Sequence, residues 1–210
     1  MHILAHRGDW HSPHEKNSHL ALRRALNSGW GIETDIRDLD GELVISHDMP
    51  RAGALPLSTV LDDYVALRAT GMLALNIKSD GLMSALKAQL SARGIRRYFC
   101  FDMSVPDMLP YQFAGMATAA RLSEYEPEGP LSMAAPVLWV DGFHQLSVNE
   151  VQLTHWLTAG KTVCLVSPEL HGRDPYPLWQ QMAGWPKVLR HHPQLMLCTD
   201  CPALVQGGGI

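Results

Sequence analysis

Short apolar runs alternate with longer helix-like stretches along nearly the whole chain, and this alternation restricts the possible folds more than any other feature. Each run is rich in aliphatic or β-branched residues, as expected of a buried strand. Strands that alternate with helices predict a parallel sheet, and about eight such units predict an α/β fold of the (β/α)₈ TIM-barrel type. The predicted strands are 2–8, 31–38, 42–48, 72–78, 96–102, 117–125, 136–143, 162–170 and 195–200, and the predicted helices are 18–29, 58–68, 80–94, 104–115, 147–159 and 177–182.

The length of 210 residues suits one domain, 1–210, near the lower limit for a barrel. Segments 126–136 and 168–177 are expected to be long loops, and Ser58 is expected to cap the helix that it begins. Segments 31–38 and 42–48 either pair across Asp40-Gly41 as a hairpin or follow each other as extended pieces. An open doubly wound sheet is the rival fold, but HRGDWHSP after the first strand is not its Gly-rich phosphate loop.

Composition and charge exclude several classes of protein. The chain is 46% hydrophobic and 18% charged, which is typical of a globular protein. The formal net charge is -4 and there is no basic tract, so no nucleic-acid partner is expected. No run approaches the ~20 apolar residues of a membrane span, and the N-terminus lacks a signal-peptide pattern, so we expect a cytoplasmic protein without membrane insertion.

Polar side chains stand at the ends of the predicted strands, where a barrel gathers its catalytic groups. Glu33 and Asp35 are two residues apart on one strand, so both carboxylates point to the same face. Oxygen ligands of this kind suit one hard divalent cation, Mg²⁺ or Ca²⁺. His6 and His47 lie nearby in the predicted order and can transfer protons. The alternative for the carboxylates is a solvated strand edge, ion-paired to nearby cationic side chains.

Taken in order, five short motifs resemble those of the glycerophosphodiester phosphodiesterase family and its phospholipase-C-like barrel relatives. The motifs are His6-Arg7-Gly8, Lys16-Asn17-Ser18, Glu33-Thr34-Asp35, Asp40-Gly41 and His47-Asp48. The resemblance extends less sharply to the C-terminus through LNIKSD, FDMSVPDML and CTDCPALV. It implies a TIM-barrel enzyme of lipid metabolism that hydrolyses glycerophosphodiesters or related small phosphodiesters with a divalent cation.

The resemblance also assigns roles to individual residues. His6 and His47 would divide the general-base and general-acid roles. Arg7 and Lys78 would clamp the phosphate, and Glu33, Asp35 and residue 76 would hold the cation. Glu169 and Arg173, in the loop after the seventh strand, are further candidates for substrate binding, against the alternative of a loop stabilised by its own ion pairs.

Two departures from the family pattern bear on these roles. Asn76 stands where the family usually supplies a third metal-binding carboxylate. An amide oxygen can still ligate Mg²⁺ or Ca²⁺, with weaker binding expected, and Glu124 or Glu169 could supply the missing carboxylate. The segment between His47 and the third strand is shorter than the family insertion that helps enclose the glycerol moiety. The departure at 49–71 therefore concerns the substrate more than the chemistry.

Two other functions remain open alongside the hydrolase. A catalytically impaired barrel that binds a phosphorylated small molecule would account for Asn76, although a pure binder has no need of two proton-transferring histidines. A phosphosugar isomerase or aldolase could use Lys78, but it would leave Glu33, Asp35 and the paired histidines unexplained. The expected partner in every case is a small molecule, and no motif specifies an oligomeric state.

Overall fold

A computed structural model describes residues 1–146 and 148–208 as a mixed α/β protein. The chain divides into two compact units, which are described separately. The N-terminal unit is Ala5–Thr118, and the C-terminal unit combines Met1–Leu4 with Ala119–Ile210. Strand β1 (His2–His6) begins in the second of these units and ends in the first.

The N-terminal unit is built on a sheet with the strand order β4-β3-β2-β5-β6. Strand β2 pairs in parallel with β5, which pairs in parallel with β6, whereas β3 is antiparallel to both β2 and β4. The hairpin alternative for the second predicted unit is therefore confirmed. The bounds are β2 (Gly31–Leu39), β3 (Glu42–Ile45), β4 (Leu55–Pro56), β5 (Leu73–Ile77) and β6 (Tyr98–Phe101).

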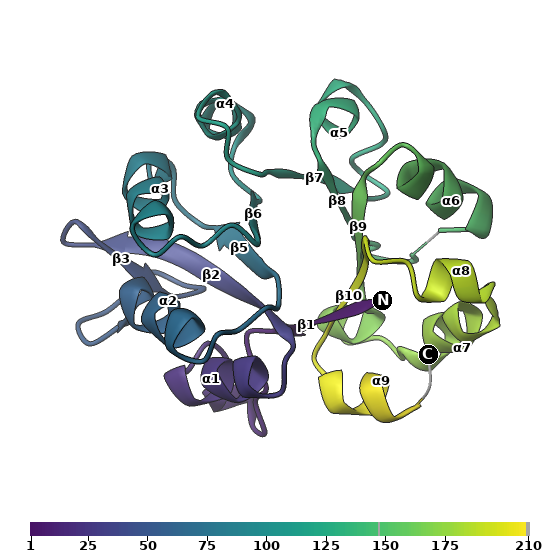
Figure 1. Ribbon diagram of the computed structural model, residues 1–210, viewed down its shortest axis with the longest axis horizontal. Coiled ribbons are helices and arrows are strands. Elements are labelled where there is room, and N and C mark those ends of the chain that lie inside the picture. Colours follow the sequence, from purple (N-terminus) through teal and green to yellow (C-terminus); the bar gives the residue numbers. More distant parts are fainter. Residues whose placement is uncertain (147, 209–210) are drawn as a thin grey trace. The chain divides into compact units, whose positions relative to one another are not determined.

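Helices of the N-terminal unit lie around β2, β3 and β5 (Figure 1). Helix α1 buries Leu22 and Leu26 and packs on β2 and on α2, which in turn packs on β3. Side chains of this kind supply most of the stabilising apolar burial, roughly 1.5–3 kcal/mol for each large aliphatic residue. The bounds are η1 (Pro13–Glu15), α1 (His19–Asn27), α2 (Leu57–Ala66), α3 (Met83–Ala92) and α4 (Val105–Phe113).

Gly8 brings the chain from β1 into close contact with α1. Its φ is +89°, in the left-handed region, and a Cβ atom there would lie 2.6 Å from the backbone carbon of Ala21. Only glycine satisfies both conditions, so Gly8 fixes the turn that carries His6 and Arg7. The hairpin turn likewise uses positive φ at Asp40 (52°) and Gly41 (85°).

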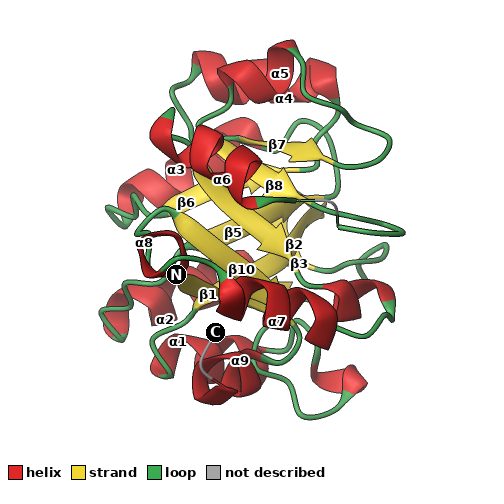
Figure 2. Ribbon diagram, turned by 90° about the vertical axis from the view of Figure 1, so that its right-hand side faces the viewer, coloured by secondary structure: helices red, strands yellow, loops and turns green. Residues whose placement is uncertain are grey.

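The C-terminal unit contains four parallel strands in the order β7-β8-β9-β10. Helices cover these strands on the side turned toward the reader in Figure 2. The core joins strand residues such as Leu138 and Leu165 to Trp156, Trp179 and Trp185. The bounds are β7 (Ala119–Leu122), β8 (Val137–Val140), β9 (Thr162–Val166), β10 (Leu195–Thr199), α5 (Pro130–Ala134), α6 (Glu150–Thr158), η2 (Pro168–His171), α7 (Tyr176–Gly184), α8 (Lys187–Arg190) and α9 (Pro202–Gly208).

Several predicted boundaries are wrong. Ser58 lies inside α2. The N-cap of this helix is Pro56, which makes no side-chain capping hydrogen bond. The segments predicted as loops, 126–136 and 168–177, contain the short helices α5 and η2. Helix α6 begins at Glu150 after an Asn149–Gln152 capping box, and Ser147, its predicted first residue, lies outside the described residues.

Two chain-wide observations complete the description. Within residues 1–146 and 148–208, no helix is long and apolar enough to cross a membrane. All four cysteines are free thiols, and Cys198 is buried.

Candidate active site

Two carboxylates are buried on strand β2 of the N-terminal unit. Glu33 is 2% exposed and Asp35 is fully buried, so this edge is not solvated, although Asp35 does have the ion pairs that the alternative expects. Asn76 on β5 is directly opposite Asp35 in the parallel register and is 7% exposed. One oxygen of each side chain, Glu33 Oε2, Asp35 Oδ1 and Asn76 Oδ1, is buried without a hydrogen-bond partner. Buried polar atoms are normally paired, so this concentration of unsatisfied oxygens is unusual.

Three cationic or ionisable side chains face these carboxylates. Arg7 Nε lies 3.0 Å from Asp35 Oδ2, and Lys78 Nζ lies 3.5 Å from Asp35 Oδ1. His6 Nε2 lies 3.7 Å from Glu33 Oε2. Burial, followed by repulsion from the Asp35 charge, nevertheless raises the pKa of Glu33 to about 7. The nearby cationic side chains therefore do not compensate fully for the energetic cost of burying two carboxylates.

Backbone hydrogen bonds tie the surrounding segments to the part of β2 that carries the acidic pair. The Arg7 N–H donates to the Glu33 carbonyl at 2.9 Å, and the Ser46 N–H donates to the Asp35 carbonyl at 3.0 Å. The Lys78 N–H donates to the Ile36 carbonyl at 2.9 Å. Arg7, Lys78 and the residue before His47 are thus positioned by the same strand that carries the acidic pair.

The two histidines differ in exposure and in their contacts. His6 ends β1 with its side chain 12% exposed, beside Glu33. The His47 side chain is 49% exposed, and its Nδ1 lies 2.8 Å from Asp48 Oδ1. The His47 carbonyl accepts a hydrogen bond from Arg37 Nε at 3.1 Å. With Nδ1 engaged by a carboxylate, the other ring nitrogen of His47 can take part in a further hydrogen bond or proton transfer.

The donor set at β2 and β5 fits a hard divalent cation. Two carboxylates and an amide each contribute an oxygen without a hydrogen bond, and oxygen is the ligand type that Mg²⁺ and Ca²⁺ take. No group of three or more His, Cys, Asp or Glu side chains with metal-binding geometry occurs among residues 1–146 and 148–208. The third predicted ligand is Asn76, whose amide is not among these four residue types.

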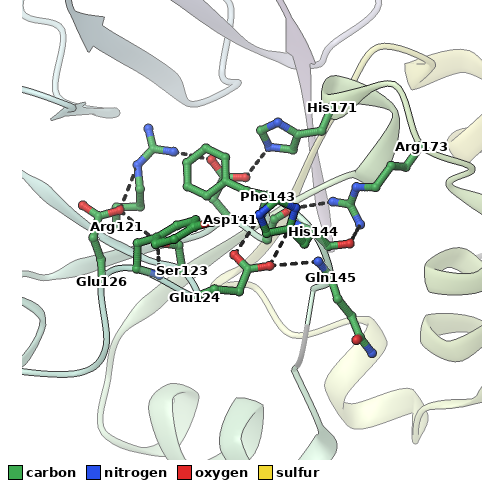
Figure 3. A network of polar contacts seen from close by, with 12 residues as sticks. Arg121, Ser123, Glu124, Glu126, Asp141, Phe143, His144, Gln145, His171 and Arg173 are labelled. Atoms are coloured by element: carbon green, nitrogen blue, oxygen red, sulfur yellow. Dashed lines mark hydrogen bonds and ion pairs between the residues drawn. The ribbon is translucent and has the colours of Figure 1, made fainter.

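Glu124 and Arg173 belong to the C-terminal unit, where both hold the loop after β8 (Figure 3). Glu124 accepts backbone N–H bonds from Phe143, His144 and Gln145 at 2.8–2.9 Å. These bonds, that of Gln145 first, lower the pKa of Glu124 to about 2. Arg173 donates to the carbonyls of Gly142 and His144. Both side chains are therefore committed to backbone groups of one loop.

Glu169, also in the C-terminal unit, has one engaged and one unengaged oxygen. Its Oε1 accepts from the Thr199 hydroxyl and from the Asp200 N–H, the latter at 3.1 Å. Its Oε2 is buried without a hydrogen-bond partner. A nearby pair, Asp141 with His171, is held by an ion pair of 2.6 Å, and Asp141 also binds Arg121.

Sequence reasoning noted Asn17 only as part of a motif and gave it no role. Its amide contacts both Thr34 and Asp35 on β2. The contact between Asp141, directly after β8, and His171 was not predicted from the sequence either. In the sequence, the only signal for this contact is that both residues follow strands. The two residues are 30 apart in the chain, so their spacing does not reveal the contact.

Comparison with known proteins places the chain by its fold. No protein-family profile and no curated protein sequence matches it. A glycerophosphodiester phosphodiesterase from Agrobacterium tumefaciens is similar, with a TM-score of 0.69 and 19% identity over 99% of this chain and 100% of that one. An Oleispira antarctica phosphodiesterase in complex with the product sn-glycerol-3-phosphate gives 0.64 and 14%, over 99% and 96% of the two chains.

A third structure widens the comparison. A Ca²⁺-dependent phosphatidylinositol-specific phospholipase C from Streptomyces antibioticus gives a TM-score of 0.57 at 12% identity, over 98% of this chain and 94% of that one. The chain therefore has the fold of the glycerophosphodiester phosphodiesterases and their phospholipase-C-like relatives. The predicted fold class, an α/β protein of the TIM-barrel type, is confirmed.

Proposed function

We propose that this protein is a metal-dependent phosphodiester hydrolase acting on glycerophosphodiesters or a related small phosphodiester. The observation that carries the proposal is the acidic end of β2, where buried oxygens of Glu33, Asp35 and Asn76 have no hydrogen-bond partner. An uncompensated buried carboxylate costs several kcal/mol, so a bound cation would relieve the cost and explain the arrangement. The similar enzymes named above support the reaction class.

Arg7 and Lys78 would bind the substrate phosphate beside that cation. Both already approach Asp35, and their side chains are about one-fifth exposed, at 21% and 22%. A guanidinium matches two phosphate oxygens at once, while an ammonium adds a compact charge. Mg²⁺ or Ca²⁺ held by Glu33, Asp35 and Asn76 would supply neutralisation of phosphoryl charge. The calcium dependence of the similar phospholipase C supports a divalent cation.

His6 and His47 would act as the general base and general acid. His6 is held near Glu33, with its Nε2 3.7 Å from Glu33 Oε2. His47 contacts Asp48 through Nδ1, so its remaining ring nitrogen can give a proton to the departing alcohol or take one from the attacking hydroxyl. Each residue of this kind contributes typically about 10²- to 10⁴-fold.

The residues of the C-terminal unit extend the proposal. Glu169 is a candidate for substrate binding because its Oε2 is buried and has no hydrogen-bond partner. For Glu124 a metal-ligand role, and for Arg173 a phosphate-binding role, stay predictions, and each would require the side chain to leave its backbone partners. The cytoplasmic location and the organisation as one domain also stay predictions from sequence.

A binding protein without turnover is the second candidate, and Asn76 favours it. An amide in place of a carboxylate removes one negative charge from the cation shell, which lowers cation affinity. The same phosphate-binding residues, Arg7 and Lys78, would then hold a phosphorylated small molecule without cleaving it.

A phosphodiester panel separates the two candidates. The protein is treated with EDTA and assayed on glycerophosphocholine, glycerophosphoethanolamine and bis(p-nitrophenyl) phosphate, before and after Mg²⁺, Ca²⁺ or Mn²⁺ is restored. The hydrolase predicts turnover that EDTA abolishes, that a cation restores and that Asp35→Asn eliminates. Asp62→Asn, an exposed carboxylate of the same unit, is the matched control. Saturable binding of sn-glycerol-3-phosphate without turnover on any diester would instead support the binding protein.

A further inference from the structure

Asn17 occupies a backbone conformation that few residues accept, directly before the helix α1. Its φ is +61°, in the left-handed region, where asparagine is among the best-tolerated residues after glycine. Its N–H donates to the carbonyl of Arg7 at 2.9 Å, and the next residue, Ser18, caps α1. The backbone of Asn17 is therefore held between the turn that carries Arg7 and the start of a helix.

The side chain of Asn17 makes two hydrogen bonds to consecutive residues of β2. Nδ2 donates to Asp35 Oδ2 at 2.8 Å, and Oδ1 accepts from the Thr34 hydroxyl at 2.7 Å. An ionised carboxylate only accepts and the Thr34 hydroxyl can donate, so both bonds together determine which end of the amide carries nitrogen. Thr34 is 1% exposed and Asp35 is fully buried, so both bonds are shielded from water.

The two oxygens of Asp35 are consequently different. Oδ2 receives the Asn17 amide and lies 3.0 Å from Arg7 Nε. Oδ1 has no hydrogen-bond partner and lies 3.5 Å from Lys78 Nζ. The Asn17 hydrogen bond and the nearby Arg7 charge thus hold Oδ2 in place, and the rotation of the carboxylate that they fix leaves Oδ1 for a cation.

We propose that Asn17 is a positioning residue for the cation site, which orients Asp35 through Nδ2 while Thr34 locks the amide. This inference rests on the proposed function for the identity of the site. Groups that orient metal ligands are commonly worth about 10- to 100-fold in metal affinity. Both side-chain hydrogen bonds of Asn17 go to β2, so its effect on the cation would pass through Asp35.

Three substitutions test the role by different routes. Asn17→Gly removes the amide and keeps a residue that accepts positive φ, so backbone strain does not contribute. Asn17→Asp keeps the shape but replaces the donor with a second carboxylate against Asp35 Oδ2. Thr34→Val removes only the hydroxyl that holds the Asn17 amide. The expected loss of affinity is about 10- to 100-fold for Asn17→Gly and smaller for Thr34→Val, whereas the added negative charge of Asn17→Asp attracts a cation and offsets part of its loss.

Isothermal titration calorimetry of Mn²⁺ and Ca²⁺ into the EDTA-treated full-length protein measures the affinities, and thermal unfolding without cation shows that each variant folds. A turnover assay adds a second readout, because Asn17→Gly should need more cation for half-maximal rate and recover the parent kcat at saturating cation. Asn27→Gly, at an exposed position of α1, is the control for glycine itself.

The outcomes are distinct. Parent-like cation affinity in Asn17→Gly overturns the inference, as does a parent protein that binds neither cation. A parent that binds cation and variants that lose it in the expected order support the inference, even if no phosphodiester is turned over. In that last case only the proposed hydrolase activity fails.

Discussion

The end of β2 and the loop after β8 both collect carboxylates and basic groups, but the two regions satisfy them to different degrees. At β2, Glu33 and Asp35 are buried and each retains an oxygen without a hydrogen bond. Glu124, which follows β7, is exposed and accepts three backbone N–H bonds from the loop after β8. The pKa values follow this contrast, raised to about 7 for Glu33 and lowered to about 2 for Glu124.

The difference separates the candidate cation site from a contact that stabilises a loop. Hydrogen bonds to the charged form keep Glu124 ionised and complete its coordination within the protein. Burial without enough partners leaves Glu33 and Asp35 dependent on a group from outside. Asn17 adds to the contrast, since it satisfies one oxygen of Asp35 and not the other.

The largest expected effect is the loss of turnover on removing either histidine. His6→Ala and His47→Ala should each lower kcat by roughly 10²- to 10⁴-fold, because each removes a proton-transfer group. Steady-state assays on the best diester of the panel measure the loss, and circular dichroism checks the fold. His14→Ala, at an exposed position of η1, should retain parent activity. Near-normal turnover in either His6→Ala or His47→Ala would refute the two-histidine mechanism.

The next effect is on the stability of the cation-free protein. The pKa of Glu33 is raised from 4.5 to about 7, so folding favours the protonated form. The stabilisation is present below about pH 4.5 and is lost as pH rises to about 7, by up to about 3 kcal/mol. Urea unfolding in EDTA across this range should show the decline in the parent and not in Glu33→Gln. Glu42→Gln, on neighbouring β3, should decline as the parent does, and an equal decline in Glu33→Gln would contradict the assignment.

A smaller and opposite change is expected on restoring a carboxylate at position 76. Asn76→Asp adds a negative charge opposite Asp35, which should tighten Mn²⁺ or Ca²⁺ binding by about tenfold, or about 1.4 kcal/mol. It should also lower the stability of the cation-free protein through repulsion. Calorimetric titration and urea unfolding measure the two effects, with Asn27→Asp as the surface control for added charge. Unchanged affinity would place residue 76 outside the cation shell.

The smallest effect is expected in the loop after β8. Glu124→Gln keeps the shape and loses the charge, so the N–H bonds of Phe143 to Gln145 weaken and stability should fall by less than about 1 kcal/mol, as for other exposed charged contacts. The contribution of this carboxylate is present above about pH 4.5 and is lost as pH falls toward its pKa of about 2. Thermal unfolding measures it, with Glu150→Gln as control. A loss of cation affinity would instead assign Glu124 as a ligand.

The principal strands and long helices could be predicted because their residues carry a repeated apolar pattern. Strand β5, with the sequence LALNI, and α1, with its apolar face, are examples in which pattern and burial coincide. The short elements α5, α8 and α9 have four to seven residues, too few for a helical period to be recognised in the sequence. Their helical form depends on packing with the rest of the unit.

The amino-acid sequence by itself determined the alternation of strands and helices and the pairing of two acidic residues on one face of a strand. Both depend on spacing along the chain, through the periods of the helix and the strand. Only the tertiary structure decided which carboxylates are left unsatisfied, because hydrogen bonding depends on residues distant in sequence. Asn17 reaches Asp35 across 18 positions, and Glu124 reaches Phe143 across 19. One glutamate, Glu33, is thereby part of a candidate cation site at β2, and another, Glu124, anchors the loop after β8.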